Sequence, residues 1–384
     1  MQKKIYLDYA ASTPVAPEVL VAMLESLNSV FGNPASTQHN FGNQANQQIE
    51  MAREQLATVF NAHSQDFIFT SGATEANNFV LKSVAQRFQS HGKHIITSAI
   101  EHKCVLDTCK FLETQGFKIT YLKPDSTGII DVVELANNIT SETILVSIMH
   151  VNNETGVIQN IEKIAEITAE HGVFFHVDAA QSVGKLTIDL KKIPVSFLSF
   201  SAHKFYSVKG IGGLYLRNRA KLKLSPQLHG GGQEFGLRSG TLPTHQIIAM
   251  ATALNLANEN IITDYGHSQV LKNQLLKNIS PLSAMLNGSQ KYTLPNIVNL
   301  SFENVSADAL LIALRNDVAI ATGSACNAGA IEASHVLRAM GIEGERLYGV
   351  VRLSFGRYTT LDDVDFASKR LIEEVTRLRQ LAHL

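Results

Sequence analysis

Residues Phe197-Leu-Ser-Phe-Ser-Ala-His-Lys204 form an apolar, strand-like segment that ends in a lysine. A second segment of the same kind, Val173-Phe-Phe-His-Val-Asp-Ala-Ala-Gln181, carries an aspartate where its apolar run ends. Strands that are apolar on both faces are typical of a parallel sheet covered by helices on both sides. Asp178 and Lys204 are separated by about one βα unit, so we expect both at the ligand-binding edge of such a sheet.

The same alternation extends from about residue 65 to residue 220, where short β-branched or aromatic runs are separated by longer amphipathic stretches. This pattern predicts βα units and a mostly parallel central sheet. The predicted strands are Phe67–Thr70, His94–Thr97, Thr120–Leu122, Ile144–Met149, Val173–Val177, Phe197–Ser201 and Gly213–Leu216. The predicted helices are Thr74–Arg87, Val105–Gln115 and Ile161–His171.

The C-terminal part has a different pattern, and from Ser306 onward we expect helices to dominate. Apolar residues at spacings of three and four predict one amphipathic helix near the C-terminus. These residues are Leu361, Val364, Ala367, Leu371, Val375 and Leu378. The segment Ile262–Gln290 is expected to connect the two parts. The predicted fold class is therefore α/β, with a large domain over residues 14–261 and a smaller α+β domain made of residues 1–13 and 262–384.

Composition and charge exclude several classes of protein. The 384 residues include 33 Lys+Arg and 34 Asp+Glu, so the formal net charge of −1 gives no reason to expect nucleic acid or an anionic membrane as the main partner. A hydrophobic fraction of 45% is too high for a disordered chain. Three cysteines cannot form a disulfide framework. With no signal peptide or membrane-spanning run in view, we expect a cytoplasmic protein.

Lys204 and Asp178 suggest a specific cofactor. A nearly buried amine is costly, and a Schiff base with an aldehyde cofactor would remove that cost. Pyridoxal phosphate also needs an anion beside its pyridine nitrogen, which Asp178 can supply, while Gln181 can donate to the phenolic oxygen. Taken singly, Lys204 could be a lysine that extends from a strand end to solvent, and Asp178 could be a helix N-cap.

The segment Phe67-Ile-Phe-Thr-Ser-Gly-Ala-Thr-Glu-Ala76 supplies a third part of this site. A strand meets a glycine turn and then opens a helix at Thr74. Free backbone N–H groups at such a helix start bind anions, which suits a cofactor phosphate. Ser/Thr helix starts are common, so the prediction depends on the combination with Lys204 and Asp178.

The segment Ala321-Thr-Gly-Ser-Ala-Cys-Asn-Ala-Gly-Ala330 consists mostly of small residues, and we expect it to be an exposed, mobile loop. Its cysteine, Cys326, is a candidate nucleophile that would need a proton acceptor or a positive neighbour. The alternative is a small apolar residue beneath a loop. Cys104 and Cys109 lie on a helical pattern, and we interpret both as packing residues.

Together these segments resemble the cysteine desulfurases, pyridoxal-phosphate enzymes of the class V aminotransferase family with the fold-type I architecture. The resemblance covers nearly the whole chain. The motif around the cysteine, Gly-Ser-Ala-Cys, is similar to that of the group with a long cysteine loop, which includes the housekeeping iron–sulfur and nitrogenase-associated desulfurases. The segments that carry it are Tyr6-Leu-Asp-Tyr-Ala-Ala-Ser-Thr-Pro14, Gly32-Asn-Pro-Ala-Ser36, Thr70-Ser-Gly-Ala-Thr-Glu-Ala-Asn77, Glu101-His102, His150-Val-Asn-Asn-Glu-Thr-Gly156, Asp178-Ala-Ala-Gln181, Ser201-Ala-His-Lys204, Arg238-Ser-Gly-Thr241, Gly323-Ser-Ala-Cys326 and Val351-Arg-Leu-Ser354.

This resemblance implies a role for each matching position. Lys204 would carry the cofactor as a Schiff base, His102 would stack on its ring and exchange protons, and Cys326 would accept the sulfur. Asn153 and Arg352 would hold the substrate carboxylate, and no metal is implied. The implied cofactor-binding residues are Ala73, Thr74, His102, Asn153, Asp178, Gln181, Ser201, His203, Lys204 and Thr241, the last from the other subunit of a homodimer.

The implied reaction takes sulfur from L-cysteine and leaves L-alanine and a persulfide on Cys326. A protein would then receive the sulfur, either an iron–sulfur scaffold or a tRNA- or DNA-sulfuration protein, without direct contact to nucleic acid or membrane. In this interpretation the large domain binds pyridoxal phosphate and the small domain carries the mobile cysteine loop. The chain is short after Arg352, so weaker docking of a housekeeping scaffold is expected.

Two other interpretations remain at this stage. A transaminase or selenocysteine lyase would use the same cofactor site without a persulfide, and Cys326 in its glycine-rich loop disfavours the transaminase. A catalytically idle partner-binding homologue is disfavoured by the joint presence of Lys204, Asp178, His102, Arg352 and Cys326. One departure from the family pattern, Gln233-Glu-Phe235 in place of His-Glu-Arg, removes a cation near the expected dimer edge of the cofactor site.

Overall fold

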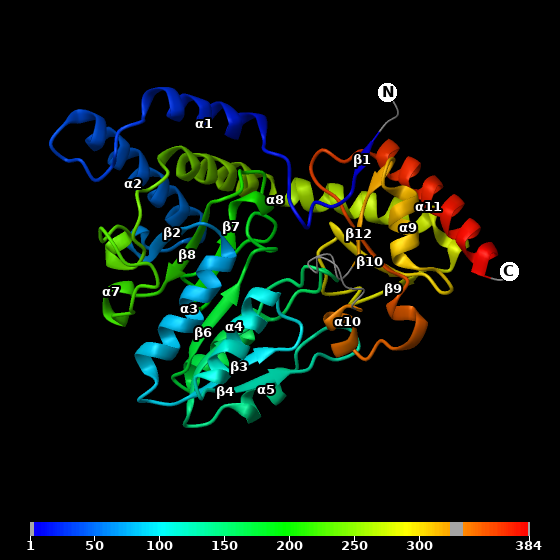
Figure 1. Cartoon of the computed structure of the whole chain (residues 1–384), viewed down its shortest axis with the longest axis horizontal. Helices are drawn as coiled ribbons and strands as arrows, with labels where there is room; N and C mark the ends of the chain where they lie inside the picture. Colours follow the sequence, from blue (N-terminus) through cyan, green and yellow to red (C-terminus); the bar gives the residue numbers. More distant parts are fainter. Residues whose placement is uncertain (1–3, 323–332, 383–384) are drawn as a thin grey trace.

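A computed structural model describes residues 4–322 and 333–382 of the chain (Figure 1). The helices are α1 Pro17–Ser29, α2 Asn40–Phe60, α3 Ala73–Phe88, α4 Lys103–Thr114, α5 Val132–Asn138, α6 Ile161–Glu170, α7 Arg219–Leu222, α8 Thr244–Asn278, α9 Ala307–Leu314, α10 His335–Ala339 and α11 Leu361–Ala382. The strands are β1 Ile5–Tyr6, β2 Phe67–Thr70, β3 His94–Ser98, β4 Lys118–Leu122, β5 Thr143–Ser147, β6 Phe174–Asp178, β7 Phe197–Ser201, β8 Gly212–Leu216, β9 Met285–Leu286, β10 Ile297–Ser301, β11 Val318–Ala319, β12 Ala321–Thr322 and β13 Val350–Ser354.

The central sheet has the strand order β2-β8-β7-β6-β5-β3-β4. Strands β7, β6, β5, β3 and β4 are mutually parallel, and only β8 runs against its neighbours β2 and β7. Successive residues of a strand belong to different apolar clusters, as Ile95 and Ile96 of β3 do, because helices cover both faces. The predicted α/β fold with a mostly parallel sheet is confirmed.

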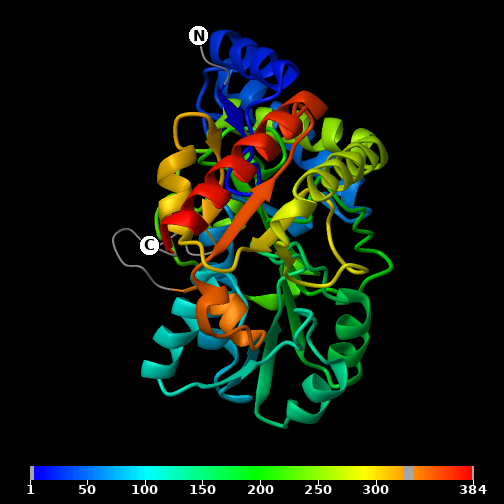
Figure 2. The same ribbon diagram turned by 90° about the vertical axis from the view of Figure 1, so that its right-hand side faces the viewer.

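A second assembly gathers the C-terminal elements and the N-terminus. Strands β12, β13, β10 and β9 form an antiparallel sheet, and β1 pairs in parallel with β11. Figure 2 faces this assembly and shows α11 lying across it. The predicted C-terminal helix is confirmed, because Val364, Ala367, Leu371 and Val375 of α11 are buried in its core. The sequence analysis missed β10 and β13, which are wholly buried.

Helix α8 connects the two assemblies, as Figure 1 shows. Its first half packs into the core of the central sheet through residues such as Leu254 and Ala257, and its second half packs into the C-terminal core through Leu271 and Leu275. Between them Ile262 is 87% exposed, so no single apolar stripe runs along the helix, and the sequence analysis did not recognise it. The predicted boundary at residues 261/262 lies inside α8, and the division into domains stays a prediction. In the described ranges, neither α8 nor another helix has the apolar length required to cross a bilayer.

Candidate active site

A cavity of about 570 Å³ lies at the sheet edge where β6 and β7 end. Strand β2 runs in the same direction as β7, because each is antiparallel to β8, so its carboxyl end lies at this edge too. Segments that follow these strands therefore converge on one space. The residues predicted from the sequence that line it are Ala73, Thr74, His102, Asn153, Asp178, Gln181, Ser201, His203, Lys204 and Arg352. Thr241 is exposed and does not line it, and Cys326 lies outside the described residues.

Lys204 reaches the cavity from the short turn that follows β7. Its Nζ donates hydrogen bonds to the backbone carbonyls of Ala10, at 2.7 Å, and Ala11, at 2.8 Å. The side chain of Gln181 donates to the same Ala10 carbonyl, at 2.8 Å. The N-terminal segment after β1 is thus a wall of the site, a role for Ala10 and Ala11 that the sequence analysis missed.

Asp178 ends β6 and is held as an oriented hydrogen-bond acceptor. Its Oδ2 accepts from Asn77 Nδ2 at 2.7 Å, and its Oδ1 accepts from the backbone N–H of Ala180 at 2.9 Å. Asp178 is 4% exposed and Asn77 is fully buried. Two donors stabilise the ionised form of a buried carboxyl group. Asp178 therefore suits a protonated pyridine nitrogen.

His102 caps the start of α4 and lies beside a thiol. Its Nδ1 accepts from the backbone N–H of Cys104 at 3.2 Å, and Cys104 Sγ lies 3.0 Å from the same nitrogen. A backbone N–H can only donate, so Nδ1 is an acceptor and the proton of the neutral ring is on Nε2. Asn77 Nδ2 also lies 3.1 Å from Cys104 Sγ. Cys104 packs against an apolar core cluster, as expected, and it also lines the cavity, which the sequence analysis missed; Cys109 is buried as expected.

The start of α3 lies at the cavity and is joined to the end of β7. The backbone N–H of Ala73 donates to Ser201 Oγ at 2.7 Å, which joins the helix start to the end of β7. Ala73 and Thr74 line the cavity, and because the first N–H groups of a helix have no partner within the helix, a phosphate in the cavity suits this helix start. Burial, with the positive charges of Lys204 and other lysines, lowers the pKa of His203 to about 4, so its ring is neutral at pH 7.

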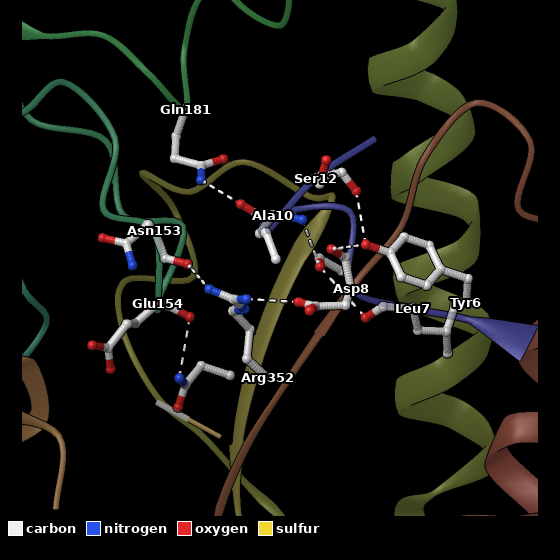
Figure 3. A network of polar contacts seen from close by, with 12 residues as sticks. Tyr6, Leu7, Asp8, Ala10, Ser12, Asn153, Glu154, Gln181 and Arg352 are labelled. Atoms are coloured by element: carbon white, nitrogen blue, oxygen red, sulfur yellow. Dashed lines mark hydrogen bonds and ion pairs between the residues drawn. The ribbon is translucent and has the colours of Figure 1, made fainter. Parts of the chain in front are cut away.

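Arg352 lies on β13 between two oxygen acceptors, as Figure 3 shows. Its Nη2 is 2.7 Å from Asp8 Oδ1, and its Nη1 donates to the backbone carbonyl of Asn153 at 2.8 Å. Among the described residues its buried Nε has no acceptor. The sequence analysis missed Asp8, although the segment that contains it was one of the segments that carried the resemblance.

Glu154 is buried beside Arg352 and connects the two assemblies. Ser334, which caps α10, donates to Glu154 Oε2 at 2.5 Å. Burial raises the pKa of Glu154 to about 7, although the Ser334 hydroxyl and the Arg352 charge both lower it. This contact fixes one described border of the cavity, since Ala333 and Ser334 both line it.

These residues fit pyridoxal phosphate. The carboxylate of Asp178 suits the pyridine nitrogen, the start of α3 suits the phosphate, and the amine of Lys204 suits the aldehyde. Two buried polar atoms of the cavity, Gln181 Oε1 and Arg352 Nε, have no partner among the described residues, as expected of a pocket that receives polar ligands.

Comparison with known proteins agrees with this geometry. A model of the aminotransferase class-V family matches residues 5–366. A cysteine desulfurase IscS from Buchnera aphidicola subsp. Acyrthosiphon pisum (strain 5A) is 49% identical over 387 residues, covering 100% of this chain and 96% of the relative. A solved NifS-like protein has a TM-score of 0.92 at 36% identity, over 98% of this chain and 100% of that one. The structure of SspA in complex with cysteine has a TM-score of 0.83 at 40% identity, over 93% and 100% of the two chains.

Proposed function

This chain belongs to the class-V aminotransferase family, and from that premise we propose how its residues remove sulfur from L-cysteine. The protein is a pyridoxal-phosphate-dependent cysteine desulfurase. The residue assignments rest on one observation: the same cavity is lined by Lys204, Asp178, His102 and Arg352. These four come from different segments of the sequence, and all line the cavity.

The cofactor would be held at three points. Asp178 would accept from its pyridine nitrogen, the N–H groups at the start of α3 would bind its phosphate together with Ser201, and Lys204 would attach to its aldehyde. When bound, pyridoxal phosphate supplies an electron sink for the carbanion that forms when the substrate loses its α-proton. His102, at the start of α4, would cover one face of the ring.

Lys204 and His102 would move the protons. The Lys204 amine, which follows the carboxyl end of β7, would be the base that takes the substrate's α-proton. The ring of His102 presents Nε2, because Nδ1 is occupied by the N–H of Cys104. Nε2 is the atom that would exchange a proton with a thiol in the cavity.

Arg352 would bind the substrate's α-carboxylate together with Asn153. A guanidinium offers five donors in a planar fork that matches a carboxylate, and Arg352 Nε is a buried donor without a described acceptor. Arg352→Ala should weaken cysteine binding about ten- to a hundredfold, because losing a charge-assisted hydrogen bond costs roughly 1.5–3 kcal/mol. Calorimetric titration of the variant would measure this.

Cys326 would attack the substrate sulfur and keep it as a persulfide, leaving alanine. The support is local sequence and the cavity itself: the described residues closest to Cys326 in sequence on each side, Thr322 and Ala333, both line the cavity. Cys326→Ser should still bind pyridoxal phosphate and change its absorbance when cysteine is added, but release no sulfide. Sulfide release near the wild-type rate would remove Cys326 from the reaction.

The Lys204 assignment has its own test. The purified protein should be yellow, and borohydride reduction should attach the cofactor to the peptide that contains Lys204. Lys204→Ala should lose this attachment while Lys185→Ala, a matched change of a nearby lysine that does not line the cavity, should keep it. A colourless protein that gains no colour with added pyridoxal phosphate would contradict the cofactor assignment.

A homodimer would complete the site. Thr241 is exposed and does not line the candidate active-site cavity of its own chain, which agrees with a role in the partner's phosphate site. Helix α1 also exposes an apolar stripe at helical spacing, which continues past its end. The stripe consists of Leu20, Leu24, Leu27 and Phe31, between 46% and 71% exposed.

Disrupting the stripe tests the dimer. Leu24→Asp should shift the protein toward monomers in sedimentation velocity and lower its affinity for the cofactor, because a buried charge at an interface is costly. Val133→Asp on α5, another exposed apolar position, is the control and should leave the association state unchanged. A wild-type protein that is monomeric at micromolar concentration would contradict the proposal.

The sulfur acceptor would be a protein, either an iron–sulfur scaffold or a tRNA- or DNA-sulfuration protein, and the proposed location is the cytoplasm. Both proposals rest on the sequence. Transfer of labelled persulfide sulfur from Cys326 to purified candidates would identify the acceptor, and transfer to small thiols alone would contradict a protein acceptor. Deleting residues 376–384 should leave cysteine desulfuration intact and would measure how far docking depends on the C-terminus.

A further inference from the structure

The carboxylate of Asp8 lies against the guanidinium of Arg352, which is proposed to bind the substrate carboxylate (Figure 3). Asp8 Oδ1 is 2.7 Å from Arg352 Nη2, and both residues line the cavity. The Arg352 side chain is 6% exposed and that of Asp8 is 21% exposed. The guanidinium proposed to bind the substrate therefore already carries a negative partner from the protein itself.

Backbone pairing holds Asp8 beside Arg352. Asp8 forms a β-bridge with Ser354, two residues beyond Arg352 on β13. On either side of Asp8 the pairing continues, since Ser354 N donates to the Leu7 carbonyl at 2.8 Å and Ala10 N donates to Ser354 Oγ at 2.9 Å. The strand that presents Arg352 thus also fixes Asp8, and their proximity does not depend on one flexible side chain.

Arg352 has capacity for a second carboxylate. A guanidinium has five N–H donors, whereas the described partners are one carbonyl at Nη1 and Asp8 at Nη2. The buried Nε has no described acceptor. A ligand carboxylate in the cavity can accept from guanidinium N–H groups that these partners leave unused while Asp8 stays in place, but the two anions would then lie within several ångströms of each other and repel.

We propose that Asp8 is a positioning residue for the proposed carboxylate site: it orients Arg352, compensates its buried charge when the site is empty, and competes with the carboxylates of substrate and product. L-Cysteine and L-alanine carry the same α-carboxylate, so an uncompensated Arg352 would hold both more tightly. Binding shared by substrate and product does not speed the chemical step, and it slows product release. Asp8 therefore limits carboxylate affinity and keeps alanine release fast.

The test measures binding of 3-mercaptopropionate to the holoenzyme by calorimetry. This thiol carries a carboxylate but no amine, so it cannot attach to the cofactor. Asp8→Asn should bind it about ten- to a hundredfold more tightly than the wild type, because the competing charge is gone while the shape is kept. The neutral 3-mercaptopropionamide should bind both proteins equally. Asp8→Glu, which retains the charge, should bind 3-mercaptopropionate far more weakly than Asp8→Asn does.

A matched control is available in the same chain. Asp264→Asn breaks an ion pair with Arg357 that has the same 2.7 Å contact and the same 21% exposure of the aspartate. It should leave the affinity for 3-mercaptopropionate unchanged. With cysteine, Asp8→Asn should lower both KM and kcat and strengthen inhibition by L-alanine, which a simple loss of stability would not do.

The proposal rests on Arg352 being the carboxylate site, and the variants separate the two claims. If Arg352→Gln does not weaken binding of 3-mercaptopropionate, the site assignment fails. If Arg352→Gln weakens binding of 3-mercaptopropionate while Asp8→Asn binds it as tightly as the wild type or more weakly, the proposed role of Asp8 is wrong. If Asp8→Asn does not fold, Asp8→Ser replaces it in the test. Tighter binding of 3-mercaptopropionate by Asp8→Ser would support the role of Asp8, and equal or weaker binding would contradict it.

Discussion

Asn77 joins two proposed catalytic side chains that are far apart in sequence. Its Nδ2 lies 2.7 Å from Asp178 Oδ2 and 3.1 Å from Cys104 Sγ, and that sulfur lies 3.0 Å from His102 Nδ1. The group that would pair with the pyridine nitrogen and the ring that would cover it are therefore parts of one hydrogen-bonded chain. Such a chain fixes both side chains before a cofactor binds.

Cys104→Ala tests how much of this chain depends on the thiol. We expect full cofactor binding and a decrease in sulfide release of about tenfold or less, because the Cys104 backbone N–H still orients His102. The measurement is sulfide release at saturating cysteine, with Cys109→Ala, a buried thiol on the same helix, as the control for packing. Complete loss of sulfide release with Cys104→Ala would show that Cys104 itself carries sulfur.

At the scale of elements, the proposed phosphate site depends on how closely β8 approaches the turn before α3. A Cβ atom at Gly212 would lie 2.4 Å from the Phe200 carbonyl oxygen and 2.6 Å from Gly72 Cα. Both neighbours are backbone atoms and cannot move aside as a side chain can. A glycine is therefore required on β8 at this position if Ser201 and the start of α3 are to meet.

Gly212→Ala should therefore lower the free energy of unfolding by about 1–3 kcal/mol and weaken cofactor binding, because strand β8 must shift to relieve the overlap. Gly266→Ala on α8 is the opposite case, since its Cβ would meet no atom within 4 Å. That change should stabilise the protein by about 1 kcal/mol through helix propensity. Chemical denaturation measures both, and equal effects of the two changes would contradict the packing argument.

A buried ion pair joins α2 to the loop that precedes Thr241. Arg53 contacts Glu234 at 2.8 Å, and Glu234 also accepts from the backbone N–H of Phe69 on β2 at 2.6 Å. Both charged side chains are almost completely buried. The pair therefore fixes the loop that leads to Thr241, proposed to face the partner, against the strand that leads to the proposed phosphate site.

Arg53→Met should destabilise the protein by about 3–5 kcal/mol, because it leaves Glu234 as an unpaired buried charge. The double change Arg53→Met with Glu234→Gln should recover a large part of that loss. Lys163→Met, which breaks an exposed pair with Glu166, should cost less than about 1 kcal/mol. Denaturant midpoints compare the three variants, and an Arg53 effect as small as that of Lys163 would contradict the argument.

Over the whole molecule, buried carboxyl groups make stability depend on pH. Burial raises the pKa of Glu101 from 4.5 to about 8, although hydrogen bonds from Ser98 and the Met149 N–H lower it. Between these values the folded protein holds a proton that the unfolded chain releases. The contribution of Glu101 to the free energy of unfolding is therefore greatest below pH 4.5, and it decreases as the pH rises to 8. Glu154 acts in the same direction between pH 4.5 and 7.

Glu101→Gln should flatten this dependence, since a neutral amide has no proton to lose. The decrease in the free energy of unfolding between pH 5 and pH 8 should shrink by an amount on the order of 3 kcal/mol. Glu166→Gln, a change of an exposed carboxylate, should leave the dependence as in the wild type. The measurement is chemical denaturation across this pH range, and an unchanged slope in Glu101→Gln would contradict the raised pKa.

The sequence alone predicts the central sheet and most of the residues that line the cavity at its edge. Strands such as β2 and β7, apolar on both faces, leave a continuous local signal, and the predicted bounds of these two are those of the structure. Lys204 and Asp178 follow directly from their strands, so the order of βα units already places them at one edge. Strand β13 was missed because the helical pattern of α11 dominates this part of the sequence. Helix α8 was missed because the face that it buries changes midway along the helix.

Folding in three dimensions decided which side chains meet across the two assemblies. Asp8 and Arg352 lie near opposite ends of the chain, and they touch because the segment after β1 forms a β-bridge with the end of β13, between Asp8 and Ser354. The carbonyl of Ala10 meets Lys204 for the same reason. Periodicity reports which face of an element is buried, but not which element covers it, because packing partners are chosen by contacts between segments that are distant in sequence.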